Sequence, residues 1–258
     1  MILFALVLVF IFILITLLCK PRPVEQCTFI SPSCQPCFLV HSFDGYKRYW
    51  EPWIHFFFKF HREPVWPVYF ASETVPVVDQ RVFPILTGKG EWGARLIQAL
   101  QNIPEDYIFY FQEDIWLTNT LTQDYLDAAV QTIHENNLNY LKLQADCRFT
   151  VGLLDRIQDR RWYIISHHPG LWRKSYLLST LQAHMTPFQH EITLNTYLHQ
   201  HHTEADQCKC NLDFDTRVFP YIDASKRGKL CQEGLRMIQA DGLQLLIESG
   251  AVLERKDC

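Results

Sequence analysis

Short apolar runs alternate along the chain with longer segments in which apolar residues recur every three or four positions. The apolar runs are typical of buried β-strands, and the periodic segments are typical of amphipathic helices. The expected strands are 38–41, 67–71, 83–86, 107–111, 140–143, 162–166 and 218–222, and the expected helices are 46–60, 91–103, 122–135, 173–182 and 191–199, with further helices towards the C-terminus. Strand and helix alternation indicates right-handed βαβ units, and therefore an α/β fold with an open, mixed but mostly parallel sheet flanked by helices.

The segment Tyr107–Phe111 consists only of apolar and aromatic residues. An unbroken run of this kind is the composition of a strand that is buried on both faces of a largely parallel sheet. Gln112, Glu113 and Asp114 follow it at once. Because ligands of open α/β sheets bind beyond the carboxyl ends of the strands, we expect a functional site at this point of the fold.

An apolar leader precedes the expected sheet. Ile2–Leu18 contains one polar residue, Thr16. As a helix this segment would be about 27 Å long, which is enough to cross the hydrocarbon core of a bilayer. A cleaved signal peptide or a lipid-modified Cys19 would both call for small residues before position 19, where the chain has leucines. We therefore expect three parts, a single-pass transmembrane anchor (1–20), a stalk rich in Pro and Cys (21–36) and a folded domain (37–258).

The side of the membrane on which the domain lies stays open at this stage. Lys20 and Arg22 follow the leader and favour a cytoplasmic domain. The chain has nine cysteines, which could form disulfides in an oxidising compartment or remain thiols in a reducing one.

Composition excludes two classes of protein. The chain is 48% hydrophobic and 20% charged, and without the leader it is still about 44% hydrophobic, which is ordinary for a globular domain and excludes disorder. Lys and Arg number 24 against 28 Asp and Glu, for a net charge of −4. A nucleic-acid partner is not expected, because such proteins carry a basic footprint.

Polar side chains follow three of the expected strands, as the pairs Ser42 and Asp44, Ser72 and Glu73, and Glu113 and Asp114. Two neighbouring carboxylates repel each other unless a cation or hydrogen bonds hold them. A hard divalent ion that also binds phosphate oxygens is one solution. A solvated loop would contain the same residue types, so both interpretations stay open.

Seven motifs carry a likeness to a known family when they are taken in order. They are Ser42–Tyr46 with Trp50–Pro52, Trp66–Phe70, Trp92–Leu96, Tyr107–Leu117, His168–Leu178, Thr186–Glu191 and Tyr221–Lys229. This ordered set resembles sugar transferases of the GT-A type, which are nucleotide-sugar enzymes found among surface-polysaccharide genes and in large viruses. The resemblance covers most of the chain after the stalk. Each motif is short, so the specificity lies in the order of the set.

The resemblance implies a GT-A-like domain with a nucleotide-sugar site over the strand ends. Asp114, together with Glu113, stands where the family has its acidic metal or diphosphate motif, usually two aspartates. The implied cofactor is Mg²⁺ or Mn²⁺, which would neutralise the leaving diphosphate. The other substrate contacts expected are Arg95 at the phosphates, Trp92, His168, Gly170 and Trp172 at the sugar, and the strand-end residues Ser42, Asp44, Ser72 and Glu73.

Glu191 is the candidate base for the acceptor hydroxyl in an inverting transfer, because it follows a loop and starts a predicted helix. Its alternative role is that of an acidic residue favoured by the helix dipole. Trp172 and the histidines before it could present an aromatic face to a sugar, or Trp172 could belong to the core.

These observations lead to three hypotheses. The first is a membrane-anchored glycosyltransferase that uses a nucleotide-sugar donor and a glycan or lipid-linked acceptor. The second is a non-catalytic membrane protein of the same fold that binds glycans or nucleotide sugars. The third is a tethered structural protein stabilised by disulfides or zinc, which only the cysteine count supports.

Overall fold

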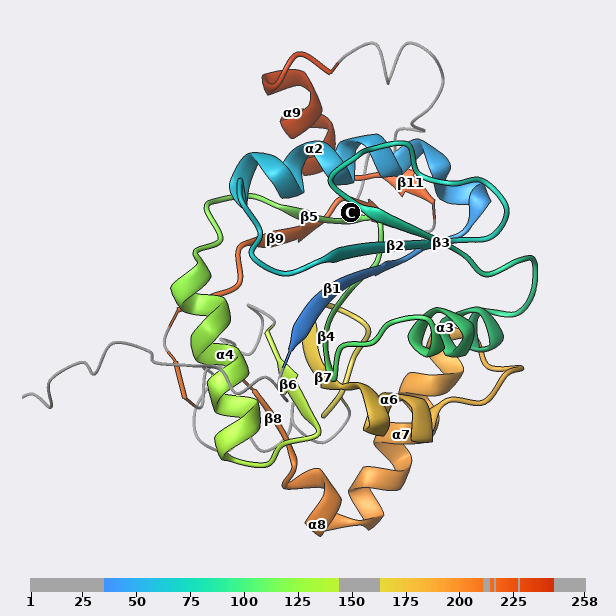
Figure 1. The fold of residues 1–258 in the computed structure, drawn as a ribbon, viewed down its shortest axis with the longest axis vertical. Coiled ribbons are helices and arrows are strands. Elements are labelled where there is room, and N and C mark those ends of the chain that lie inside the picture. The colour runs from blue at the N-terminus through green and yellow to red at the C-terminus, as the bar shows by residue number, and fades with distance from the viewer. Residues whose placement is uncertain (1–34, 144–162, 211–213, 216, 227, 244–258) are drawn as a thin grey trace, which may run out of the picture. The chain divides into compact units, whose positions relative to one another are not determined.

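The computed structural model describes residues 35–143, 163–210, 214–215, 217–226 and 228–243. At the centre of the described fold is a seven-stranded sheet with the strand order β3-β2-β1-β4-β7-β6-β8 (Figure 1). Its strands are β1 (Pro36–His41), β2 (Val68–Ser72), β3 (Phe83–Leu86), β4 (Tyr107–Phe111), β6 (Tyr140–Lys142), β7 (Gly170–Arg173) and β8 (Cys208–Cys210).

The sheet is mixed and mostly parallel, as predicted. The first four strands in spatial order, β3, β2, β1 and β4, are all parallel to one another. β7 is antiparallel to both of its neighbours, and β8 is parallel to β6. All four parallel strands therefore end at one edge, where the residues that follow them come together.

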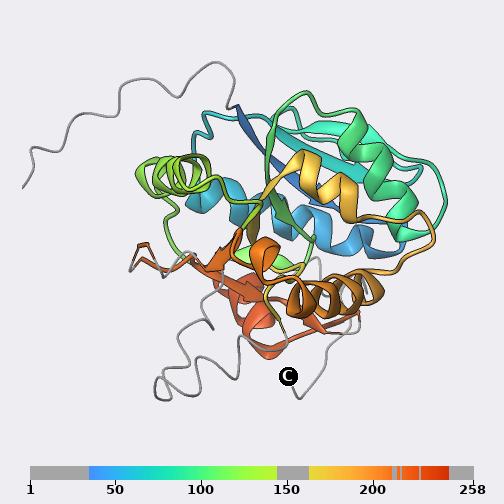
Figure 2. The ribbon, with the colours of Figure 1, turned by 90° about the horizontal axis from the view of Figure 1, so that it is seen from below.

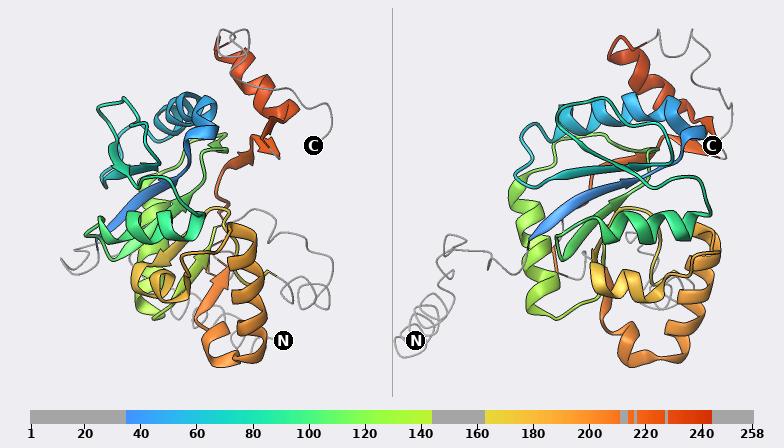
Figure 3. Two further views of the ribbon diagram at one scale, coloured as in Figure 1. Left: turned by 90° about the vertical axis from the view of Figure 1, so that its right-hand side faces the viewer. Right: turned by 45° about the vertical axis from the view of Figure 1, so that its right-hand side comes forward.

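Two hydrophobic clusters cover the two faces of this sheet because strand side chains alternate between faces. Phe38 and Phe109 face one cluster, whereas Leu39 and Tyr110 face the other. The helices divide in the same way (Figure 1), and Figure 2 and Figure 3 show them from other sides. The first face receives α2 (Trp50–Phe60), α4 (Gln123–Glu135) and α9 (Gln232–Ala240), and the second receives α3 (Trp92–Gln101), α6 (Lys174–Thr180) and α7 (Pro187–Gln200).

Short elements complete the described fold. A 3-10 helix, η1 (Asp44–Tyr49), precedes α2, and a short helix, α8 (His202–Ala205), follows α7. Two small antiparallel sheets pair β5 (Ile115–Leu117) with β9 (Tyr221–Asp223), and β10 (Ser225–Lys226) with β11 (Lys229–Leu230). The β5–β9 pairing brings the C-terminal segment to the residues that follow β4.

Elements with a strong local pattern were predicted closely. β4 has the bounds predicted from its apolar run, and Thr122 caps α4 by accepting a hydrogen bond from the backbone N–H of Tyr125. The predicted strand at 162–166 is wrong in its described part, because residues 163–169 form no strand and β7 begins at Gly170. α7 begins at Pro187 and not at the predicted residue 191. Thr186 and Gln189 form a capping box at this start.

Among the described residues, no helix combines the length and the apolar character needed to cross a bilayer. The predicted anchor (1–20) and residues 21–34 of the predicted stalk lie outside the described residues. Cys37 and Cys208 are buried free thiols, whereas Cys210 and Cys231 are disulfide-bonded. Cys208 and Cys210 therefore do not act together as a pair of zinc-binding thiolates.

Candidate active site

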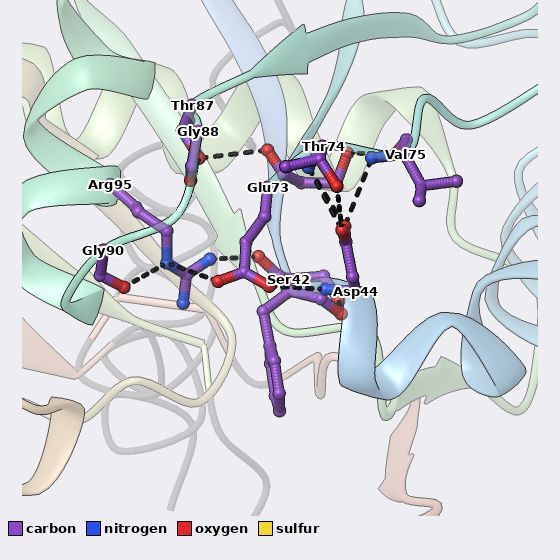
Figure 4. A network of polar contacts seen from close by, with 11 residues as sticks. Ser42, Asp44, Glu73, Thr74, Val75, Thr87, Gly88, Gly90 and Arg95 are labelled. Atoms are coloured by element: carbon purple, nitrogen blue, oxygen red, sulfur yellow. Dashed lines mark hydrogen bonds and ion pairs between the residues drawn. The ribbon is translucent and has the colours of Figure 1, made fainter.

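The carboxyl ends of the parallel strands carry a connected polar network (Figure 4). Arg95, from the first turn of α3, is only 7% exposed, and its Nη1 donates to the backbone carbonyl of Ser42 at 2.6 Å. Its Nε donates to the carbonyl of Gly90 at 3.1 Å and lies 3.9 Å from a carboxylate oxygen of Glu73. The guanidinium thus ties the loops after β1, β2 and β3 together, which is a role that the sequence did not predict.

The loops after β1 and β2 are also joined to each other. The Asp44 carboxylate accepts hydrogen bonds from the hydroxyl of Thr74 at 2.5 Å and from the backbone N–H of Val75 at 3.3 Å. The backbone N–H of Asp44 donates to Glu73 at 3.1 Å. Burial raises the pKa of Asp44, but the hydrogen bonds outweigh it and hold this pKa below its ordinary value. Asp44 and Glu73 were expected to contact substrate, and in the structure they order the loops at the edge of the site.

Ser42 and Ser72, expected as substrate contacts, are both buried and hydrogen-bonded to neighbouring residues. Ser42 is 3% exposed, and its hydroxyl oxygen accepts a hydrogen bond from the indole N–H of Trp50 at 2.7 Å. Ser72 is fully buried, and its hydroxyl donates to the carbonyl of Val75 at 2.6 Å. The Ser42 hydroxyl thus binds a residue of α2, and the Ser72 hydroxyl binds the loop after β2.

Glu113 and Asp114 lie at the end of β4, where the chain turns into β5. Burial, and next the charge of Asp114, raise the pKa of Glu113. Burial also raises the pKa of Asp114; a hydrogen bond from Ser225 (2.8 Å) opposes this, and the charge of Asp223 adds to it. The two neighbouring carboxylates are thus costly to ionise together.

Asp223 is a site residue that the sequence analysis did not select. It pairs with Ile115 in the β5–β9 register, and the next residue, Ala224, donates its N–H to the carbonyl of Asp114 at 2.7 Å. Asp223 also lies 3.8 Å from Nδ1 of His168. In the sequence it directly follows the strand predicted at 218–222 and lies inside the motif Tyr221–Lys229.

The acidic residues fit a divalent ion only in part. Within the described residues, no group of three or more His, Cys, Asp or Glu side chains is arranged to hold a metal ion. Mg²⁺, however, is commonly held by one or two carboxylates together with substrate phosphates. Asp114 and Asp223 match that incomplete donor set, because the pairing of β5 with β9 and the hydrogen bond from the Ala224 N–H to the Asp114 carbonyl bring the two residues together.

Glu191 lies in the second turn of α7, beside the loop that carries His167 and His168. One of its carboxylate oxygens accepts the backbone N–H of His167 at 2.6 Å. Burial raises the pKa of Glu191, while that hydrogen bond and then the nearby His168 oppose the rise. The charge of His168 also acts on the pKa of Asp114. The structure therefore brings together three of the residues selected from the sequence, Asp114, His168 and Glu191.

Three predicted sugar contacts belong to the core instead. Trp172 is completely buried in β7 and packs on Tyr140, with ring centroids 4.3 Å apart. Gly170 is buried. A side chain does not fit there, because a Cβ at this position would lie 2.5 Å from the Tyr140 ring. Trp92 is 9% exposed and packs edge-on against His167. Neither tryptophan has an exposed ring face.

A group of buried histidines lies behind the strand ends. Nε2 of His167 is 2.9 Å from Nδ1 of His190, whose Nε2 is 2.9 Å from the hydroxyl of Thr180. Neither ring nitrogen of His41 has a hydrogen-bond partner among the described residues. Burial lowers the pKa of His41 to about 3 and that of His190 to about 4. Both imidazoles are therefore neutral at pH 7.

We expect His41→Leu to raise the free energy of unfolding at pH 7 by about 1 kcal/mol, because it removes two buried nitrogens without partners. In the wild-type protein, His41 titrates near 6.5 when unfolded and near 3 when folded. The unfolded chain therefore binds the extra proton below pH 6.5, and stability falls as the pH falls. Urea unfolding at pH 7 and pH 5 measures this effect. Between these two pH values, the free energy of unfolding should fall less in His41→Leu than in the wild type.

Glu113 and Asp114 act in the opposite direction in this pH range, since their pKa values are raised. They are common to both proteins, so the difference between the two pH slopes isolates His41. The exposed His184, changed to Gln, serves as the control and should alter neither value. Equal slopes for wild type and His41→Leu would contradict the assignment of a neutral buried imidazole.

No family model and no curated protein matches the chain. Several solved structures are similar to it over part of their length. TarS from S. aureus in complex with UDP-GlcNAc is 14% identical with a TM-score of 0.44, over 64% of this chain and 54% of TarS. The chain thus spans about half the length of that protein.

Two further similar structures come from other organisms. The mannosyltransferase PcManGT from Pyrobaculum calidifontis, in complex with GDP-Man and Mn²⁺, is 13% identical over 94% of this chain and 71% of its own, with a TM-score of 0.49. Glucosyl-3-phosphoglycerate synthase from Mycobacterium tuberculosis, with Mn²⁺ and UDP-glucose, is 8% identical over 86% and 80%, with a TM-score of 0.47.

Proposed function

We propose that this chain is a glycosyltransferase that moves a sugar from a nucleotide-sugar donor to a hydroxyl of a glycan or lipid-linked acceptor. The observation that carries the proposal is the convergence of Asp114, Asp223, His168 and Glu191 beyond the carboxyl end of β4. These residues come from four separate segments of the sequence. Carboxylates in a solvated loop would be exposed. Asp114 and Glu191 are instead partly buried, and this burial raises their pKa values.

In the proposed reaction, the acceptor oxygen forms a bond to the anomeric carbon of the sugar, and the bond from that carbon to the phosphate oxygen breaks. The electron pair of the broken bond stays on the nucleoside diphosphate, which leaves with one more negative charge. The acceptor hydroxyl loses its proton to Glu191 in an inverting transfer. The hydrogen bond from the His167 N–H holds one oxygen of Glu191 and so fixes the orientation of the carboxylate. The other oxygen would accept the proton.

Asp114 and Asp223 would hold a divalent ion, Mg²⁺ or Mn²⁺, together with the diphosphate. When bound, this ion supplies positive charge at the leaving phosphate. The Ser225 hydroxyl and the Ala224 N–H bind Asp114 and fix its position. Glu113 has a raised pKa and is 6% exposed, so we do not include it among the residues that would hold the ion.

A screen of nucleotide sugars tests the proposal. The full chain in detergent is incubated with UDP-, GDP- and CMP-sugars in Mn²⁺ or in EDTA, and melting temperature and slow donor hydrolysis are measured. We expect one class of donor to raise the melting temperature and to be hydrolysed only with Mn²⁺. A shift without turnover would favour the non-catalytic binding protein, and no response to any donor would end the enzyme proposal.

We also propose that residues 1–20 tether the domain to a membrane. The support is the uncharged apolar stretch Ile2–Leu18. The chain should stay in the membrane fraction after extraction at alkaline pH, and its release into the supernatant would contradict the tether.

A further inference from the structure

The loop that carries His167, which precedes β7, is fastened to α7 by side chains. The Asn195 amide binds Ile165 twice, because its Oδ1 accepts the Ile165 N–H at 3.1 Å and its Nδ2 donates to the Ile165 carbonyl at 3.0 Å. Further along the loop, His167 is bound by Glu191 through its backbone N–H and by His190 through its ring. Three side chains of one helix thus hold the loop as a neighbouring strand would hold it.

The hydrogen bonds of His190 run in one direction. The Thr180 hydroxyl donates its only proton to the carbonyl of Leu177 at 2.9 Å, so its oxygen accepts from Nε2 of His190. Burial lowers the pKa of His190 and that of His167, so both rings are neutral at pH 7 and each carries one N–H. With its proton on Nε2, His190 accepts the Nε2–H of His167 at Nδ1. His190 is therefore the acceptor that fixes the ring of His167.

His190 is closed off from any substrate. It is 1% exposed, and its ring packs near Trp92 and Trp172. Both of its ring nitrogens bind other side chains of the protein. Its route to the candidate site runs through His167, whose backbone N–H binds the Glu191 carboxylate at 2.6 Å.

We propose that His190 is a positioning residue for Glu191. By accepting the Nε2–H of His167, it holds the loop where the backbone N–H of His167 reaches the Glu191 carboxylate. The inference rests on the proposed function, in which Glu191 takes the proton of the acceptor hydroxyl. General-base catalysis depends on geometry, and a misplacement of about 1 Å can cost on the order of 10²-fold in rate. His190 thus acts on the rate of transfer without touching donor or acceptor.

Two substitutions separate positioning from packing. His190→Leu removes the acceptor and leaves the Nε2–H of His167 without its partner, whereas His190→Asn keeps an acceptor oxygen close to the place of Nδ1. The full chain in detergent is assayed with Mn²⁺ and the nucleotide sugar that the donor screen selects. In His190→Leu, kcat for transfer should fall about 10- to 100-fold while donor affinity stays unchanged. His190→Asn should recover most of the rate.

The control variant is His61→Leu. It removes another imidazole that is 3% exposed and hydrogen-bonded, in this case to the Leu121 carbonyl at 3.0 Å. His61 packs on Phe38, in the hydrophobic cluster of the other face of the sheet. Whatever its effect on the melting temperature, His61→Leu should leave kcat unchanged.

The pKa of Glu191 gives a measurement that needs no turnover. The hydrogen bond from the His167 N–H opposes the rise that burial causes in this pKa. NMR of ¹³C-labelled carboxylates should therefore show a higher pKa of Glu191 in His190→Leu than in the wild type, and a value nearer the wild type in His190→Asn.

A wild-type kcat and an unchanged pKa of Glu191 in His190→Leu would overturn the inference and leave the proposed function standing. An equal loss of rate in both His190 variants would also overturn it, because packing alone would explain that result. The expected change in the pKa of Glu191, found in a protein that turns over no donor, would support the positioning and remove the proposed function.

Discussion

Asp114→Asn should abolish metal-dependent sugar transfer, with a loss of at least about 10³-fold in kcat, the order expected when several kcal/mol of charge stabilisation at a leaving group is lost. Asn has the shape of Asp, and its amide oxygen can still accept the hydrogen bond from Ser225. Steady-state transfer across a Mn²⁺ titration measures the effect. The variant should show no increase in rate at any Mn²⁺ concentration.

The same substitution should leave the fold intact and raise the melting temperature. The pKa of Asp114 is raised by burial and by the charge of Asp223, so its ionised form destabilises the folded protein at pH 7. Removing that charge relieves both effects. The matched control is Asp206→Asn, which changes an 80% exposed carboxylate outside the candidate site and should preserve turnover. Normal Mn²⁺-dependent turnover by Asp114→Asn would show that the active site is elsewhere.

The placement of Asp114 could be predicted from the sequence because it depends on local information. A run of five apolar residues identifies a buried strand, and the polar residues that follow must leave the sheet at its carboxyl end. The same reasoning located the ends of β1 and β2. Burial of a strand leaves a clear trace in composition, so these parts of the site needed no knowledge of distant contacts.

Asp223 could not be found in this way, because its position depends on a pairing between remote segments. The three-residue strand β9 reaches the site only by pairing with β5, which is equally short. The strand predicted at 218–222 overlaps β9, but three-residue strands carry no signal of which partner they pair with. β7 was misplaced for a related reason, since Gly170 is favoured there by its close contact with Tyr140 of β6.

The errors at Trp172, Ser42 and Ser72 have a different origin. An aromatic or hydroxyl side chain near a strand end suits both a ligand and the interior, and residue type does not distinguish them. In the structure, Trp172 is buried within β7, the Ser42 hydroxyl accepts the indole N–H of Trp50 in α2, and the Ser72 hydroxyl donates to the Val75 carbonyl. Side-chain chemistry identifies candidates, and only burial and hydrogen bonding show which of them remain available to a substrate.

Glu191→Gln should keep donor binding and lose transfer by about 10²- to 10⁴-fold, the usual contribution of a general base. A glutamine oxygen can still accept the N–H of His167, so the loop that carries His168 stays attached to α7. Donor affinity by titration and kcat for transfer are the two measurements. Glu135→Gln, on the exposed face of α4, is the control and should change neither.

The pH dependence of transfer separates a base from a supporting residue. Burial raises the pKa of Glu191, so the wild-type rate should fall as the pH falls through a value above that of an ordinary glutamate. This acid limb should be absent from the residual activity of Glu191→Gln, which has no proton to lose. Glu191→Ala removes the hydrogen bond to His167 as well. If Glu191→Gln transfers normally while Glu191→Ala fails, the carboxylate only holds the His167 loop, and the base is another group.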